Sequence, residues 1–389
     1  MKISYDIRGK YPEEINEDFV LKVINSINSE NLIIGHDTRE SSIKIANFIK
    51  KLAEEGKIKK TILWLGISTT PLTAFAGKIF NTTSLMITAS HLGNEYNGLK
   101  ISENGFAWEK EKYFELLEKV NNNVTFEFES DFKEIKEEVL KDYKKWLNFD
   151  TEELEIKNEE NNPGFIILKE LAFKVKSNKN ANFEFDSDCD RLYIYQESRK
   201  LHNDLIGIIL AKHLTDKGDN IIFNVGTSVL IYKELKDRDL EMVKTGRNNI
   251  IQAMKGAKFG FEYSGHFYFY DKNFDYYLDD GLKALSEVLK IKGFFKEYNN
   301  LLKKTNISEE YRVKGTLQDF KDLIEEIKKR AQNLIDIDGY RFEFIENGEL
   351  MGFYLIRQSN TEEKVSIRFE HLNKDKFEEL KKITEKFLS

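Results

Sequence analysis

Residues 31–35 read Asn-Leu-Ile-Ile-Gly, a short apolar run that predicts a buried β-strand. Two similar runs follow at residues 61–66 and 84–88. Segments with the apolar spacing of amphipathic helices, Ser41–Glu55 and Leu72–Phe80, lie between these runs. Strands that alternate with helices at this spacing predict a parallel sheet covered by helices. The first third of the chain is therefore predicted to form an α/β domain.

The same alternation returns between Asp204 and Leu289, and the pattern changes near the C-terminus. There, helices predicted over Leu317–Asn333 and from Lys374 flank three strand-like runs, at residues 340–345, 351–356 and 364–369. Strands grouped beside helices in this way indicate a small α+β domain.

The segment between the two alternating blocks is short. Only about 50 residues separate a predicted connector helix over Phe132–Leu147 from the block that begins at Asp204, which is the low end of domain size. A helix over Gly164–Lys176 and a strand over Asn182–Phe185 are predicted there. So small a unit buries too little apolar surface to be stable alone, so we expect its helix to pack on neighbouring domains.

The composition indicates a folded protein without a polyanionic partner. Of 389 residues, 40% are hydrophobic and 33% charged, which favours globular domains over disorder. The formal charge of −7 argues against a nucleic-acid partner. No run of about 18 apolar residues predicts a membrane span, and a single cysteine, Cys189, excludes a disulfide scaffold. We therefore expect a cytoplasmic protein with no membrane partner.

The sharpest chemical signal is the carboxylate loop, Asp186-Ser187-Asp188-Cys189-Asp190-Arg191, which directly follows a predicted strand. Three carboxylates at alternate positions offer the hard oxygen ligands that Mg²⁺ prefers. An EF-hand is excluded because its sixth position needs glycine and is Arg191 here. An exposed acidic turn and a phosphatase with an aspartyl nucleophile are the alternatives that these residues leave open.

A second signal is the serine loop, residues 88–93, where Ser90 and His91 follow another predicted strand and Lys100 lies ten residues on. The loop predicts an accessible hydroxyl that can hold a phosphoryl group beside cations. No G-x-S-x-G motif surrounds Ser90, so a hydrolase triad is poorly supported.

Two further turns carry polar side chains suited to an anionic sugar. The arginine loop, residues 357–362, begins with Arg357, whose guanidinium can hold a phosphate bidentately. The glutamate turn, residues 262–266, contains Glu262, Ser264 and His266. Taken alone, residues 357–362 are better explained as a polar hairpin turn, and the glutamate turn is equally compatible with a structural role. The sequence contains no P-loop and no G-x-G-x-x-G motif, which argues against ATP or NAD chemistry.

Taken in order, six motifs resemble the α-D-phosphohexomutases, which include phosphomannomutase/phosphoglucomutase, and the resemblance covers almost the entire chain. The motifs are Tyr5–Gly9, Gly35–Arg39, Thr88–His91, Asp186–Arg191, Glu262–His266 and Arg357–Glu362. The resemblance implies three α/β domains, the second one reduced, and a small C-terminal α+β domain around a central cleft. The expected boundaries are residues 1–130, 131–203, 204–304 and 305–389.

The resemblance also implies a role for each site residue. Ser90 is similar to the serine that carries the transferred phosphate, and with Asp186, Asp188 and Asp190 it would bind one Mg²⁺. Arg8, His91, Lys100 and Arg191 are similar to the family's catalytic cations and proton-transfer groups. The residues expected to bind the sugar and its distant phosphate are Lys244, Glu262, Ser264, His266, Arg357, Ser359, Asn360 and Thr361.

The expected activity is the interconversion of hexose 1-phosphate and hexose 6-phosphate, with mannose or glucose as the sugar, through a bisphosphorylated intermediate. Phosphoglucosamine mutase is the alternative within the family, and the Mg²⁺-dependent phosphatase or a non-enzymatic sugar-phosphate or metal-binding protein lies outside it. The chain departs from the family pattern at Leu92-Gly93, Arg247 and Glu363. It is expected to be a monomer or a homodimer.

Overall fold

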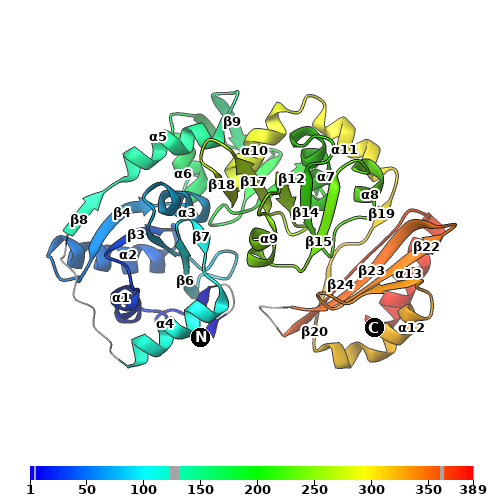
Figure 1. Ribbon diagram of the computed structural model, residues 1–389, viewed down its shortest axis with the longest axis horizontal. Coiled ribbons are helices and arrows are strands. Elements are labelled where there is room, and N and C mark those ends of the chain that lie inside the picture. The colour runs from blue at the N-terminus through cyan, green and yellow to red at the C-terminus, as the bar shows by residue number, and fades with distance from the viewer. Residues whose placement is uncertain (4–5, 123–130, 360–362, 389) are drawn as a thin grey trace. The chain divides into compact units, whose positions relative to one another are not determined.

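The computed structural model describes residues 1–3, 6–122, 131–359 and 363–388 (Figure 1). The chain divides into two compact units. The first unit comprises Met1–Lys200 and Phe269–Lys290. The second comprises Leu201–Tyr268 and Ile291–Ser389. Within the described part of the chain, helices long and apolar enough to cross a membrane are absent.

The first unit is built around an eight-stranded mixed sheet. Its strands are β1 (Lys2–Ile3), β2 (Ile7–Lys10), β3 (Asn31–His36), β4 (Thr61–Ile67), β5 (Thr83–Ile87), β6 (Tyr96–Glu103), β7 (Phe106–Ala107) and β8 (Asp131–Glu134). Their order is β1-β2-β6-β5-β3-β4-β8, with β7 beside β6. Strands β5, β3, β4 and β8 are parallel, which confirms the predicted parallel sheet, and β6, β2 and β1 add an antiparallel edge.

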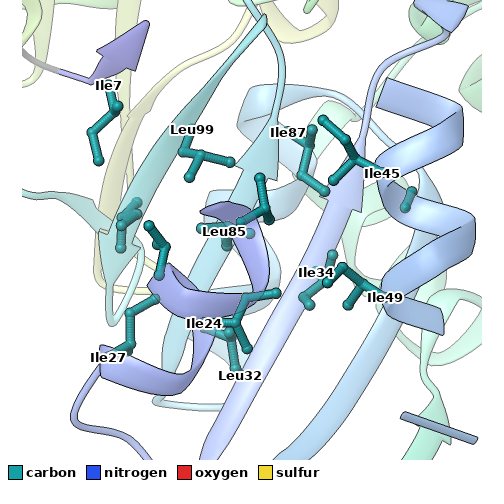
Figure 2. Close-up of a cluster of buried hydrophobic side chains, with 14 of the residues drawn as sticks. Ile7, Ile24, Ile27, Leu32, Ile34, Ile45, Ile49, Leu85, Ile87 and Leu99 are labelled. Atoms are coloured by element: carbon teal, nitrogen blue, oxygen red, sulfur yellow. The ribbon is translucent and has the colours of Figure 1, made fainter. Parts of the chain in front are cut away.

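Helices cover both faces of this sheet (Figure 1). On one face lie α1 (Glu17–Ser26), α2 (Glu40–Glu54) and α4 (Lys110–Asn121), and on the other α3 (Thr70–Ile79) and α5 (Lys136–Leu147). Alternate strand residues such as Leu32 and Ile34 meet Ile24 of α1 and Ile45 of α2 in one buried cluster (Figure 2). This cluster fixes the strand register, and hence the places where the strands end.

The remainder of the first unit holds smaller elements. They are β9 (Glu153–Ile156), α6 (Pro163–Glu170), β10 (Lys174–Ser177), β11 (Phe183–Phe185), β12 (Leu192–Gln196), β13 (Arg199–Lys200), β18 (Tyr276–Asp279) and α10 (Gly281–Lys290). Strands β9 and β10 are parallel, and β11, β12 and β13 form an antiparallel sheet.

Two helix predictions in this region are wrong at one end. The helix predicted over Gly164–Lys176 ends at Glu170, because the backbone turns at Ala172 (φ 67°) and Lys174–Ser177 pairs with β9. The helix predicted over Phe132–Leu147 begins only at Lys136, since the preceding residues extend the main sheet as β8.

The segment from residue 148 to 203 draws much of its packing from outside itself. Lys144 of α5 donates to the Leu171 carbonyl (2.9 Å), and Lys136 pairs with Glu170 (2.7 Å). Leu282 of α10 lies beside Gly164 of α6. We therefore predict that residues 148–203 expressed alone lack a cooperative melting transition in circular dichroism, because these partners are missing. A sharp transition would show that the segment is an independent domain.

The second unit combines a parallel α/β part with an antiparallel α+β part. In the first part, β14 (Asn220–Asn224) lies between β15 (Asp239–Val243) and β16 (Phe259–Phe261), and all three are parallel. Its helices are α7 (Asn203–Leu214), α8 (Leu230–Glu234), α9 (Arg247–Ala253) and α11 (Phe294–Leu302). Strand β17 (Phe267–Asp271) begins in this unit and ends in the first.

The C-terminal part contains an antiparallel sheet with helices beside it. Its strands are β19 (Asn306–Ile307), β20 (Tyr311–Lys314), β21 (Asn333–Ile335), β22 (Tyr340–Glu346), β23 (Glu349–Gln358) and β24 (Lys364–His371). The short 3-10 helix η1 (Leu317–Phe320), α12 (Lys321–Lys328) and α13 (Lys374–Leu388) complete it. The small α+β domain is confirmed, although the helix predicted over Leu317–Asn333 ends at Lys328 because β21 pairs with β22.

Candidate active site

The carboxylate loop joins β11 to β12 in the first unit, where its three aspartates are buried. One oxygen from each of Asp186, Asp188 and Asp190 lies within 4.8 Å of the others. The Oδ2 atom of Asp186 and the Oδ1 atom of Asp188 are buried and accept no hydrogen bond. Buried carboxylate oxygens left in this state are costly, and a divalent cation would satisfy them. The residues therefore fit one Mg²⁺ ion.

Side chains from earlier in the chain fix the backbone of the carboxylate loop. The Asn158 amide pairs with the backbone of Phe185 through two bonds of 2.8 Å, as a neighbouring strand would. Asn162 donates to the Asp186 carbonyl (3.3 Å). Thr70, at the start of α3, donates both its backbone N–H (2.9 Å) and its hydroxyl (2.5 Å) to Asp188. The loop is thus held before any ligand binds.

The N-terminus of α10 also supports this loop. Cys189 has φ 60°, a conformation that residues with a side chain rarely adopt. The N–H of Gly281 donates to the Cys189 carbonyl (3.0 Å), and a side chain at Gly281 would lie 2.7 Å from the Arg191 carbonyl oxygen. Burial raises the pKa of Asp280, which caps α10 and accepts from Tyr143 and Trp146, to about 6.

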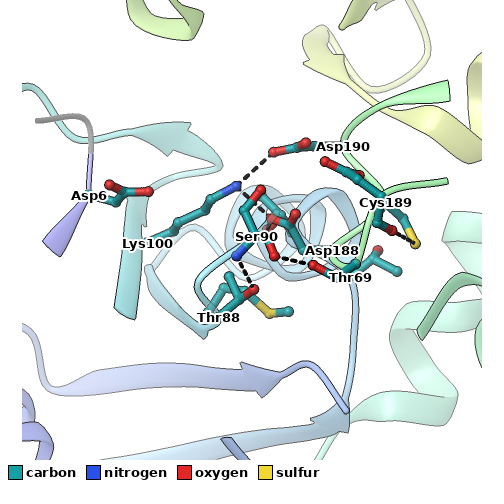
Figure 3. Close-up of polar contacts among 12 residues, drawn as sticks. Asp6, Thr69, Thr88, Ser90, Lys100, Asp188, Cys189 and Asp190 are labelled. Atoms are coloured by element: carbon teal, nitrogen blue, oxygen red, sulfur yellow. Dashed lines mark hydrogen bonds and ion pairs between the residues drawn. The ribbon is translucent and has the colours of Figure 1, made fainter. Parts of the chain in front are cut away.

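Lys100, on β6, lies against the same carboxylates. Its Nζ is 2.5 Å from Asp188 Oδ2 and 2.7 Å from Asp190 Oδ2 (Figure 3). Burial lowers the pKa of Lys100, but the two aspartates raise it further, so the lysine stays charged. Burial and the neighbouring Asp190 and Asp188 raise the pKa of Asp186 well above its ordinary value. Lys100 thus offsets part of a charge that would otherwise be hard to keep buried.

The serine loop contacts the carboxylate loop directly. Ser187 donates its hydroxyl to the Ser90 carbonyl, and Ser90 Oγ lies 3.4 Å from His91 Nδ1. Ser90 has φ 53° and is 1% exposed, so the prediction of an accessible hydroxyl is wrong. The physical reason is that the carboxylate loop packs against the serine loop, a contact that the local sequence does not reveal.

The remaining predicted catalytic residues gather at the same place. Burial, together with the Arg191 and Arg8 guanidinium groups, lowers the pKa of His91 to about 4, so its imidazole is neutral near pH 7. Asp6 orients Arg8 through Nε (2.8 Å) and Nη2 (2.7 Å). Arg191 Nε lies 3.7 Å from Asp186 Oδ2 and 3.9 Å from Asp190 Oδ1. Guanidinium groups placed in this way suit the binding of a phosphoryl group.

In the second unit, the glutamate turn joins β16 to β17 and closes through the Glu262 N–H on the His266 carbonyl (2.9 Å). The Glu262 carboxylate is buried and accepts from the Gly246 N–H (2.8 Å) and the Tyr268 hydroxyl (3.1 Å). It therefore ties the turn that contains Lys244 to the glutamate turn. Ser264 is half-buried, Lys244 is exposed and His266 is buried.

Arg357 lies within β23, not in a loop as predicted, and Ser359 directly follows this strand and donates its N–H to the Lys364 carbonyl (2.8 Å). Arg357 Nη1 is 3.5 Å from Asp338 Oδ2, and the same oxygen accepts from the Thr245 N–H (3.1 Å). Asp338 thus connects Arg357 to the Lys244 turn. The predicted ligands Asn360 and Thr361 lie outside the described residues.

The predicted site residues therefore divide into two groups, one in each unit. The first unit brings together Arg8, Ser90, His91, Lys100, Asp186, Asp188, Asp190 and Arg191. Lys244, Glu262, Ser264, His266, Arg357 and Ser359 belong to the second unit. The sequence analysis missed four supporting residues, Asp6, Thr70, Asn158 and Asp338. Two of them carried a signal: Asp6 lies within the motif Tyr5–Gly9, and Thr70 lies in Ser68-Thr69-Thr70-Pro71, which marks a helix start.

Comparison with known proteins agrees with this architecture. Two models of one family match, "Phosphoglucomutase/phosphomannomutase, alpha/beta/alpha domain I" over residues 3–126 and domain III over residues 202–305. A phosphoglucosamine mutase of Thermotoga neapolitana is 25% identical, with 98% of each chain covered. A phosphomannomutase/phosphoglucomutase of Pseudomonas syringae is also 25% identical, with 94% of this chain and 90% of the relative covered.

The fold is shared with solved structures as well. A phosphoglucomutase/phosphomannomutase family protein from Burkholderia thailandensis superposes with a TM-score of 0.79 at 18% identity, covering 99% of this chain and 96% of the other. The multidomain α/β fold and the ordered motifs define a phosphohexomutase-type protein. The chain belongs to the α-D-phosphohexomutase family.

Proposed function

We propose that this chain is a phosphohexomutase that interconverts hexose 1-phosphate and hexose 6-phosphate, with Ser90 as the phosphoryl carrier. The proposal rests on the hydrogen bond that the Ser187 hydroxyl, in the carboxylate loop, donates to the Ser90 carbonyl, in the serine loop. A hydroxyl, three buried carboxylates and cationic side chains lie around this contact, which supports the proposal. Relatives named as mutases of such sugars support this activity.

In this mechanism the bond from phosphorus to Ser90 Oγ breaks as a new bond forms to a sugar hydroxyl oxygen, whose proton must leave. We expect proton transfer to involve His91, whose imidazole is neutral, and Lys100, which stays charged beside its aspartates. The resulting hexose bisphosphate turns over, and its other phosphate returns to Ser90. Asp186, Asp188 and Asp190 would hold Mg²⁺, which supplies charge neutralisation to the phosphoryl oxygens. Arg8 and Arg191 add positive charge from the protein itself.

The second unit would bind the rest of the substrate. We expect the glutamate turn and the Lys244 turn to contact sugar hydroxyls, and the arginine loop, with Arg357, Ser359, Asn360 and Thr361, to hold the phosphate distant from Ser90. Because Glu262 already accepts bonds from Gly246 and Tyr268, its main part is to align these two turns. Mannose and glucose differ at one hydroxyl, so both are candidate sugars, and so is glucosamine.

The test is a coupled assay with the 1-phosphates of glucose, mannose and glucosamine, each started with a trace of hexose bisphosphate, with and without Mg²⁺. We expect the 6-phosphate to form from at least one sugar, only with the metal. Release of inorganic phosphate without any 6-phosphate would instead support the aspartyl-nucleophile phosphatase. Binding of the sugar phosphates without turnover of any would support a non-enzymatic binding protein.

We predict that Arg357→Ala acts mainly on substrate binding. A charge-assisted hydrogen bond contributes about 1.5–3 kcal/mol, so KM should rise roughly 10- to 100-fold, with a smaller change in kcat. Arg357→Lys keeps the charge but loses the bidentate geometry, so its KM should fall between those of the wild type and Arg357→Ala. Steady-state kinetics measures all three. An unchanged KM in Arg357→Ala would show that residues other than Arg357 bind the distant phosphate.

A further inference from the structure

The motif Gly35–Arg39 has no role in the mechanism above, yet its last residues contact the serine loop. Arg39 lies between the end of β3 and the start of α2, and its side chain is 9% exposed. Its Nη2 donates to the carbonyls of Ser90 and Leu92 (2.7 Å to Leu92), and its Nη1 donates to the Gly93 carbonyl (2.8 Å). One guanidinium group therefore binds three carbonyls of the serine loop.

Asp37 holds this guanidinium in place. Its Oδ2 accepts from Arg39 Nε (3.2 Å) and from the Thr88 hydroxyl (2.6 Å), and its Oδ1 accepts from the Arg39 N–H (3.1 Å). The Thr88 hydroxyl in turn accepts from the Ser90 N–H (2.9 Å). Both sides of Ser90 are thus connected to Asp37, its N–H through Thr88 and its carbonyl through Arg39.

The bonds within the serine loop, from the Ser90 N–H to Thr88 and from the Leu92 N–H to the Ala89 carbonyl (3.3 Å), leave the Ser90 carbonyl to be held from outside the loop. Ser90 adopts the left-handed region, which a residue with a side chain populates reluctantly. The loop contains no proline, and Gly93 restricts the backbone less than any other residue. A strained conformation persists only where the surroundings impose it.

We infer that Asp37 and Arg39 are positioning residues that impose the left-handed conformation of Ser90 and so aim its hydroxyl. Neither touches the reacting atoms in this assignment, which rests on the proposed phosphoryl-carrier role of Ser90. A lysine at position 39 cannot replace the arginine, because a single ammonium group lacks the planar fork that reaches three carbonyls and Asp37 together. The role therefore depends on geometry rather than on charge.

The test compares Arg39→Ala, Arg39→Lys and Thr88→Val with wild type, and uses Arg330→Ala, an exposed arginine on the other unit, as the control. Displacement of a reacting group by about 1 Å costs on the order of 100-fold. We expect kcat to fall by that order in both Arg39 variants, with KM within about twofold. Guanidinium added to Arg39→Ala should restore part of kcat. Thr88→Val keeps the side-chain shape and covers the case in which Arg39→Ala fails to fold.

A second measurement does not depend on catalysis. Hydrogen exchange of a peptide spanning residues 88–96 should become faster in the three variants, while the rest of the first unit exchanges as in wild type. If the wild type is active, a normal kcat in the variants would overturn the positioning role of Asp37 and Arg39. Unchanged exchange in that peptide would overturn it as well. If the wild type is inactive but the exchange pattern is as expected, the proposed function is refuted, while Asp37 and Arg39 still hold the serine loop.

Discussion

Ser90→Ala is expected to lose mutase activity by at least ~10³-fold while the protein stays folded. Loss of the hydroxyl removes the only atom of the residue 90 side chain that can carry the phosphate beside His91. Intact-mass analysis of the purified wild type should also find a phosphorylated fraction, with the phosphate on the peptide that contains Ser90. The variant should lack that fraction.

Ser187→Ala is the matched control for this experiment. Its hydroxyl lies in the same site but donates to the Ser90 carbonyl, so it supports the loop and carries no phosphate in our assignment. The control should keep a phosphorylated fraction on the Ser90 peptide. Full activity in Ser90→Ala would exclude the phosphoserine mechanism, and phosphate found on Ser187 would reassign the carrier.

The parts of the site that lie in contiguous motifs were predictable from the sequence. Asp186–Arg191 and Ser90-His91 each follow a strand, as the sequence predicted, and the two loops lie in contact. The parallel sheet followed from the alternation of apolar runs with amphipathic segments. These signals are local, so one stretch of sequence contains each of them.

The supporting contacts that join residues distant in the chain were not predictable from local motifs. Thr70 and Asp188 are 118 positions apart, and Lys100 and Asp188 are 88 apart. The burial of Ser90 has the same origin, since the contact with Ser187 spans 97 positions. No periodicity or local motif carries information of this kind in a single sequence.

The wrong helix end at Glu170 has a different cause. Leu168, Leu171 and Val175 continue a helical spacing, so the pattern favoured a helix to Lys176. The chain instead turns at Ala172 with φ 67°, a conformation that alanine rarely adopts. A glycine at this position would have indicated the turn, but the sequence has none there. Pairing of Lys174–Ser177 with β9 and burial of Phe173 and Val175 offset that cost. Tertiary contacts overrode the local pattern here.

If the three aspartates bind Mg²⁺, Asp188→Asn should strongly lower both Mg²⁺ affinity and turnover. Asp188 is fully buried, and its Oδ2 already accepts from Thr70 (2.5 Å) and Lys100 (2.5 Å), which leaves Oδ1 for a cation. The amide keeps the shape but removes one negative charge, and charge count sets affinity at hard-cation sites. Since changes to residues that only support a metal ligand cost 10- to 100-fold, Mg²⁺ affinity should fall at least ~100-fold, and turnover with it.

Titration calorimetry with Mg²⁺ measures this affinity independently of activity, and Asp142→Asn is the matched control that should bind as wild type does, because Asp142 lies on α5 and pairs with Lys145 (2.7 Å). Removing Asp188 also frees Lys100 from one of its two aspartates, so the loss cannot be assigned to the metal from activity alone. Lys100→Met separates the two effects. It should bind Mg²⁺ at least as tightly as wild type, because the competing ammonium group is gone, while losing turnover. Undiminished turnover in excess EDTA would show instead that these carboxylates serve Lys100 and not a metal.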